Sequence, residues 1–249
     1  MEEQYNMVAT TMFGLESLLE KELEKIGASQ IKKGNRCVYF VGDKEIMYQA
    51  NIQLRTALKI LKILTTFKAK RDTELYNYIR RVKWYNILNV SKTFSVTSTT
   101  NSKYFTHSNY VSLVTKDAIV DQFRKKVKNR PSVDLKNPDI NIHLHISDDK
   151  CTISLNSSGE SLHKRGYRTE FFPAPINEVL AAGIISLIDW DGNTSLIDPM
   201  CGSGTILIEA AMKNLDIPAQ ICRKKFAFMN WFNYDYDLYE KIRLELKEQ

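Results

Sequence analysis

A short stretch near residue 200 combines an acid, two glycines and a threonine at the border between two apolar patterns. Asp198 ends a short apolar run, and Gly202 and Gly204 lie in the segment that follows. From Thr205 the apolar residues repeat with helical spacing, so we expect a strand over Ser195–Asp198, a tight turn and a helix. In such a unit ligands bind beyond the carboxyl end of the strand, and the first N–H groups of the helix attract a negative group.

The residue types in this turn narrow the choice of ligand. A P-loop needs a lysine directly before the serine or threonine, and here Gly204 precedes Thr205. The dinucleotide motif needs a third glycine, and Ile206 and Leu207 occupy that part of the turn. S-adenosylmethionine fits better, because Asp198 can face its ammonium group while the N–H groups of the turn face its carboxylate. A glycine turn that only connects two elements is the alternative, since so short a match is weak by itself.

A longer motif around the turn resembles the cofactor site of a known enzyme family. The run Asp198-Pro199-Met200-Cys201-Gly202-Ser203-Gly204-Thr205, followed by Ile208-Glu209-Ala210-Ala211, resembles that of the THUMP-domain RNA methyltransferases. The most similar group is the bacterial family that methylates the exocyclic amine of a guanine in 23S ribosomal RNA. Similar segments follow the same order along nearly the whole chain: Gly14-Leu15-Glu16, Lys116–Asp121, Arg130–Asp134, Ser158-Gly159, His163–Arg168 and Ala174-Pro175-Ile176. The resemblance implies that the residues binding S-adenosylmethionine are Asp198, Pro199, Cys201, Gly202, Gly204 and Thr205.

The family pattern is incomplete in this chain. Methyltransferase domains of this type have several further strands, and the family's catalytic Asn-Pro-Pro-Tyr-type motif is absent. Asn137-Pro138 lies far upstream and is followed by Asp139, so no catalytic residue is assigned. We therefore expect the front part of an enzyme, inactive alone, with a separately encoded carboxyl-terminal half as a candidate partner. Residues after about Pro175 are expected to be loosely ordered, or paired with that half or with a second copy.

Two basic segments are candidates for contact with structured RNA. A helix expected over Val111–Val127 carries Lys125 and Lys126 at its end, with Arg130 just beyond. Lysines are also favoured there by the helix dipole, so a solvated helix end is the alternative. The segment 163–168 combines charge with an aromatic ring, as expected where phosphates and an unstacked base are contacted. Its candidate RNA contacts are Lys164, Arg165 and Arg168, and a structural linker is the alternative.

The composition restricts the class of protein. A net charge of +6 over 249 residues favours an anionic partner such as nucleic acid. The four cysteines form no C-x-x-C pair, and His143 and His145 have no third ligand at suitable spacing, so no metal is expected. The amino terminus lacks the apolar core of a signal peptide, and no apolar run approaches a membrane span. A cytoplasmic protein without a membrane partner is expected.

Short strands and helices alternate up to Asn156, which predicts an α+β fold. Strands are expected over 5–11, 37–41, 58–67, 93–97, 140–146 and 151–155, and helices over 15–26, 43–48, 75–82, 111–127, 177–187 and from 205. The resemblance divides the chain into a ferredoxin-like portion over 1–43, a THUMP RNA-binding domain over 44–157, and the connector and first unit of an incomplete Rossmann-like methyltransferase domain over 158–249. The aromatic segment 226–236 is expected to pack against the absent part of that domain.

Three functions remain open on the sequence. The first is an RNA methyltransferase, in which catalysis would come mostly from proximity and orientation of the donor and the target amine. The second is a stand-alone THUMP-type RNA-binding module with no activity. The third is a DNA adenine methyltransferase, against which the THUMP-like region argues.

Overall fold

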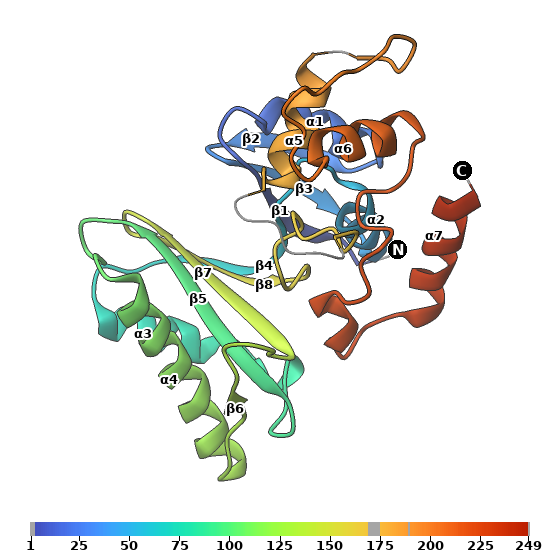
Figure 1. Cartoon of the computed structure of the whole chain (residues 1–249). Coiled ribbons are helices and arrows are strands. Elements are labelled where there is room, and N and C mark those ends of the chain that lie inside the picture. The colour runs from blue at the N-terminus through green and yellow to red at the C-terminus, as the bar shows by residue number, and fades with distance from the viewer. Residues whose placement is uncertain (1–2, 169–174, 189, 249) are drawn as a thin grey trace. The chain divides into compact units, whose positions relative to one another are not determined.

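The computed structural model describes residues 3–168, 175–188 and 190–248, so Ala174 of the connector motif lies outside the described residues. The chain divides into two compact units (Figure 1). The first contains Met1–Ile60, Glu160–Phe226 and Asp235–Gln249, and the second contains Leu61–Gly159 and Ala227–Tyr234.

The first unit begins with a small antiparallel sheet and two helices. Its elements are β1 (Tyr5–Thr10), α1 (Glu16–Lys25), β2 (Ser29–Gly34), β3 (Cys37–Gly42), α2 (Lys44–Gln53) and the start of β4 (Lys59–Lys68). β3 pairs antiparallel with both β1 and β2. Alternate strand residues such as Met7 and Phe40 are buried, as are Leu19 and Leu23 of α1, so one side of the sheet and the helix share a core.

Local signals fix the end of α1 and the start of α2 close to the predicted positions. Gly27, with φ of +81°, follows α1 in the left-handed conformation that glycine adopts without strain. Asp43 caps α2, because its side chain accepts a hydrogen bond from the backbone N–H of Ile46 at 2.9 Å. α2 then continues to Gln53, beyond the expected end at residue 48.

The second unit is a sheet covered by two helices. Its elements after the start of β4 are α3 (Asp72–Arg81), the short helix η1 (Trp84–Asn86), β5 (Thr93–Asn101), α4 (Ser108–Val127), β6 (Ser132–Val133), β7 (Ile140–Ser147), β8 (Lys150–Asn156) and η2 (Ala227–Asn230). The strand order is β4-β8-β7-β5-β6. β7 and β8 form the expected antiparallel hairpin, while β5 runs parallel to β7. The apolar residues of β7 are all buried, and α3 and α4 pack against each other (Figure 1).

The strand predicted over Ser195–Asp198 does not form. The structure has no regular element between residue 190 and the start of α6 (Thr205–Asn214). The apolar side chain of Ile197 in this segment is exposed. A strand needs a neighbour to pair its backbone N–H and C=O groups, and no other strand of the described chain lies beside this segment. α5 (Glu178–Leu187), which precedes this segment, contacts α6.

The helices after Pro175 are packed rather than loosely ordered. An added Cβ at Gly183 of α5 would lie 2.7 Å from the side chain of Leu15, so α5 approaches the start of α1 closely. α7 (Tyr236–Glu248), which the sequence did not predict, packs on α2, with Tyr239 and Tyr48 edge to face at 6.1 Å between ring centroids. These helices therefore complete the core of the first unit.

The aromatic segment also finds partners within the chain, contrary to expectation. In the first unit, Phe226 contacts the ring of Tyr239 at 6.4 Å between centroids. In the second unit, Phe228 is buried in η2, which packs against β7, and its backbone N–H donates to the carbonyl of Ser157. Within the described ranges, every helix is too short or too polar to cross a membrane.

Candidate cofactor site and candidate RNA interface

The turn before α6 has the open backbone that the sequence predicts. Gly202 and Gly204 have φ of +53° and +73°, a region that residues with side chains rarely adopt. The N–H of Gly204 donates to the carbonyl of Cys201 at 2.8 Å and closes the turn. An added Cβ at Gly202 would meet nothing within 4 Å, so space for a ligand lies beside the backbone. No side chain caps α6, so its first N–H groups are available to an anion.

Asp198 lies on the amino-terminal side of this turn. One carboxylate oxygen accepts a hydrogen bond from the N–H of Met200 at 3.1 Å, and the side chain is half-buried. Pro199 and Cys201 are exposed, whereas Thr205 is buried at the start of α6. A carboxylate at one end of the turn and uncapped helix N–H groups at the other fit the ammonium and carboxylate of an amino-acid group. These residues therefore fit the methionine end of S-adenosylmethionine.

Arg168 holds this turn against the connector. Its Nε donates to Glu178 Oε1 at 2.6 Å, and its Nη2 donates to the carbonyl of Ile176 at 3.2 Å. Its Nη1 donates to Ser203 Oγ at 3.1 Å, and its Nη2 also donates to Thr205 Oγ1 at 2.8 Å. The sequence predicted an RNA contact here, but the chain itself engages all three guanidinium nitrogens. Arg168 is thus placed to orient the turn.

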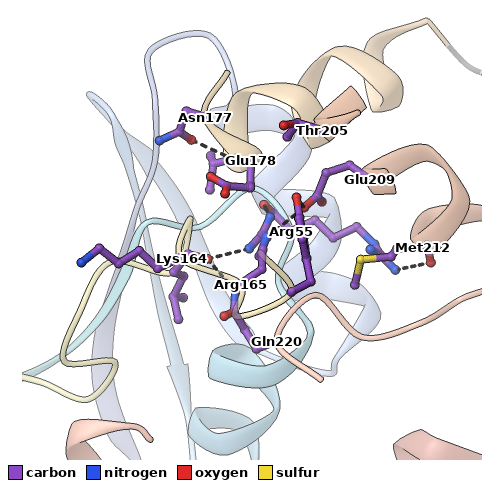
Figure 2. Close-up of polar contacts among 12 residues, drawn as sticks. Arg55, Lys164, Arg165, Asn177, Glu178, Thr205, Glu209, Met212 and Gln220 are labelled. Carbon is purple, nitrogen blue, oxygen red and sulfur yellow. Dashed lines mark hydrogen bonds and ion pairs between the residues drawn. The ribbon is translucent and has the colours of Figure 1, made fainter. Parts of the chain in front are cut away.

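Arg165 forms an ion pair with Glu209 of α6 (Figure 2). Both side chains are buried, at 1% and 0% exposed. Arg165 Nε donates to Glu209 Oε1 at 3.2 Å, and its Nη1 and Nη2 donate to the carbonyls of Leu162 and Arg55. The Tyr167 hydroxyl also donates to Glu209 Oε1 at 3.2 Å. Burial raises the pKa of Tyr167, and the nearby Glu209 carboxylate raises it further. The prediction that Arg165 contacts RNA is wrong, because its guanidinium does not reach solvent.

A second arginine, Arg55, is half-buried and links the segment after α2 to the end of α6. Arg55 donates to the carbonyls of Met212 at 2.9 Å and Ile217 at 2.5 Å. Glu22 of α1 accepts hydrogen bonds from the N–H groups of Arg55 and Thr56 at 3.1 Å each. Burial raises the pKa of Glu22, opposed by the hydrogen bonds from Thr56 and the charge of Arg55. The sequence held one signal of this network, because Glu22 occupies a position on the apolar face of its helix.

Lys125, Lys126 and Arg130 are exposed at and beyond the end of α4. Lys126 Nζ lies 3.2 Å from the centroid of the Tyr85 ring, a cation–π contact. Lys164 is also exposed, and its Nζ lies 2.7 Å from Glu160 Oε1. Exposed pairs of this kind contribute little to stability, so Lys164 remains available to a phosphate.

His143 and His145 lie two residues apart on β7, with threonine hydroxyls beside them. Thr97 Oγ1 lies 3.1 Å from Nδ1 of His143, and Thr99 Oγ1 lies 2.9 Å from Nδ1 of His145. Burial lowers the pKa of His145, and the charge of Lys150 lowers it further. No group of three metal-ligand side chains gathers anywhere in the part of the chain that the structure describes.

Comparison with known families accounts for most of the chain. Residues 6–61 match the RlmL ferredoxin-like domain, residues 69–156 the THUMP domain, and residues 165–249 the RMKL-like methyltransferase domain. The chain has the domain succession of the THUMP-containing methyltransferases. This succession confirms the predicted fold class, an α+β chain with a ferredoxin-like portion, a THUMP domain and the start of a methyltransferase domain.

Individual relatives agree with this assignment. The Synechocystis protein slr0064, to which an RNA methyltransferase activity is ascribed, is 37% identical over 234 residues. That match covers 94% of this chain and 61% of the relative. The crystal structure of SMU.472, assigned as a methyltransferase and complexed with SAH, has a TM-score of 0.86 and 32% identity over all of this chain and 65% of its own. A Listeria monocytogenes structure assigned as an N6-adenine-specific DNA methylase has a TM-score of 0.87 and 29% identity, covering 99% of this chain and 64% of its own.

Proposed function

We propose that this chain is the front part of an S-adenosylmethionine-dependent RNA methyltransferase that acts in the cytoplasm on the exocyclic amine of a guanine in 23S ribosomal RNA. The observation that carries the proposal is the combination of a THUMP domain with an uncapped glycine turn and an adjacent acid. The THUMP domain supplies a surface for RNA. The glycine turn and the acid together fit the amino-acid end of the donor.

S-adenosylmethionine supplies an electrophilic methyl group when it is bound. The residues of this chain would hold and orient it, with Asp198 near its ammonium group and the N–H groups of the turn near its carboxylate. Arg168 fixes the turn through the hydroxyls of Ser203 and Thr205. Holding two reactants in position contributes much of the rate of such a transfer. The residues that place the target amine belong to the carboxyl-terminal half of the domain, which is the proposed partner of this chain.

A second candidate is methylation of adenine in DNA, which the assignment of the Listeria relative favours. The same donor site would serve either reaction, so the nucleic acid has to be tested. The THUMP domain favours RNA, and we therefore place RNA first.

Transfer of a tritiated methyl group tests both candidates. This chain is incubated with labelled S-adenosylmethionine and either ribosomal RNA or DNA, alone and together with the carboxyl-terminal half of the methyltransferase domain. We expect label in RNA with the two parts together and none with this chain alone. Label in DNA would favour the second candidate. RNA binding without label in either mixture would favour the stand-alone RNA-binding module.

A further inference from the structure

A pocket opens beside the basic end of α4, entirely within the second unit. It has a volume of about 390 Å³, and apolar side chains that include Leu88, Val90 and Phe123 form much of its wall. Tyr85 of η1 and Lys126 of α4 also line it. Sites for small organic groups have volumes from about 300 to 1,000 Å³, so this pocket suits a single compact group.

The residue before Tyr85 is anchored firmly in the core of the second unit. This residue, Trp84, is fully buried, and its indole N–H donates to the carbonyl of Ile79 at 2.9 Å. The backbone N–H of Trp84 donates to Gln122 Oε1 of α4 at 3.1 Å. Tyr85 itself is 40% exposed. An aromatic side chain beside an anchored residue has mainly its own two side-chain torsions to restrict when it binds a ligand.

The charges around the pocket favour an anionic ligand. Lys125, Lys126, Lys128 and Arg130 are all exposed. Nowhere in residues 3–168, 175–188 and 190–248 does a carboxylate form an ion pair with one of these four. Lys126 belongs both to this group of cations and to the pocket wall, and its ammonium group lies over the Tyr85 ring. Its flexible side chain can turn from the ring toward a phosphate.

Amide groups at the rim add hydrogen-bonding capacity. The side-chain oxygen of Asn89 accepts from the backbone N–H groups of Ser91 and Lys92, and that of Asn129 accepts from the N–H of Arg130. Both residues line the pocket, and their NH₂ groups remain as donors. An apolar pocket with an aromatic ring, amide donors and adjacent cations matches the chemistry of a nucleotide, with a flat base and a charged phosphate.

We propose that this pocket takes one unpaired nucleotide of the RNA, with its base against Tyr85 and its phosphates at the four cations. This proposal rests on the proposed RNA-binding function and adds that the chain prefers RNA with an unpaired nucleotide. Bases within a duplex are stacked and cannot enter a pocket, whereas a bulged or single-stranded base can. A basic helix end alone would bind every RNA through its phosphates, so the pocket adds selection for an unpaired base.

Fluorescence anisotropy with the full chain and three hairpin RNAs tests the proposal. The first hairpin is fully paired, the second carries one bulged nucleotide, and the third carries the same bulge without its base. Stacking of a base on an aromatic ring changes affinity by about 5- to 150-fold. We expect the wild-type chain to bind the bulged hairpin at least about 5-fold more tightly than the other two. Tyr85→Ala should remove that preference, and Tyr85→Phe should keep it.

Two further variants separate the base from the phosphates. Lys126→Gln should weaken binding to all three hairpins and lower the slope of log affinity against log salt. Tyr236→Ala is the matched control, because Tyr236 is 62% exposed and belongs to the first unit, so no affinity should change.

The outcomes distinguish this inference from the function on which it rests. If the wild-type chain binds none of the hairpins, both the RNA-binding function and the pocket are overturned. If it binds all three equally and Tyr85→Ala changes nothing, as it would if the pocket served a protein contact, only the pocket is overturned. If the Tyr85→Ala chain fails to fold, the wild-type chain alone decides. Equal affinity for the bulged hairpin and for the hairpin whose bulge lacks its base would then overturn the pocket.

Discussion

The buried pair of Arg165 and Glu209 should be essential to the stability of the first unit. Replacing Arg165 by alanine would leave the Glu209 carboxylate buried, with one hydrogen bond from Tyr167 and without its paired guanidinium. Removing one partner of a buried ion pair costs about 3 to 5 kcal/mol. The carbonyls of Leu162 and Arg55 would lose their guanidinium donors as well. We therefore expect the free energy of unfolding to fall by an amount in this range.

The neighbouring residue supplies the matched control. Lys164 makes an exposed pair with Glu160, and such pairs contribute about 0 to 1 kcal/mol. The urea concentration at the midpoint of unfolding should therefore be nearly the same for Lys164→Ala as for the wild-type chain. For Arg165→Ala this midpoint should be much lower. Replacing both members of the pair, as Arg165→Met with Glu209→Leu, should recover much of the stability because neither charge of the pair is then left buried without its partner.

Hydrogen exchange followed by mass spectrometry localises the effect. Because Glu209 belongs to α6, amides of α6 should lose protection in Arg165→Ala and keep it in Lys164→Ala. A destabilisation below about 1 kcal/mol in Arg165→Ala, equal to that of the control, would refute the reasoning. So would a lowered salt slope of RNA binding in a folded Arg165→Ala chain, since that would mean that Arg165 binds a phosphate.

Three further predictions concern the two sites and Glu22. Neutralising Lys125, Lys126 and Arg130 together should weaken RNA binding and lower its log–log salt slope by about 0.7 to 0.9 for each phosphate that the chain no longer neutralises. An unchanged slope would mean that these three residues contact solvent at the helix end and do not contact RNA phosphates. Asp198→Ala, in the presence of the carboxyl-terminal half, should weaken S-adenosylmethionine binding in calorimetry and leave RNA binding intact; equal donor affinity would remove Asp198 from the site. Burial raises the pKa of Glu22 above its ordinary value of 4.5, so its stabilisation is complete below that value and is lost as pH rises through the raised pKa. The urea midpoint of Glu22→Gln should therefore rise relative to that of the wild type as pH rises through the raised pKa, and a constant difference would contradict the assignment.

The elements that the sequence predicts are those whose pattern faces a core. β7 alternates apolar and polar residues, and α4 repeats apolar residues at helical spacing, so both were predicted close to their observed bounds. β2, with the sequence Ser-Gln-Ile-Lys-Lys-Gly, has no buried residue and gave no such pattern. The prediction of a strand over Ser195–Asp198 was wrong for another reason. A strand forms only beside a second strand that pairs with its backbone, and the local apolar pattern does not show whether such a neighbour exists.

The cofactor turn was predictable because glycines and an acid lie close together in the sequence. The network around it was not, since it joins residues far apart in the chain. Arginines are mostly exposed in proteins, so Arg165 and Arg168 were interpreted as a surface for RNA. Their partners, Glu209 and Glu178, lie 44 and 10 residues away, and only the folded chain brings them together. Lys164, directly before Arg165 in the chain, does remain on the surface.

A map of methylated nucleotides in ribosomal RNA tests the central claim most directly. RNA and DNA from cells with and without the gene for this chain are digested and compared by mass spectrometry. The proposed function predicts the loss of one methyl group from the exocyclic amine of one guanine in 23S ribosomal RNA. An unchanged RNA map, or the loss of methylated adenine from DNA, would contradict it.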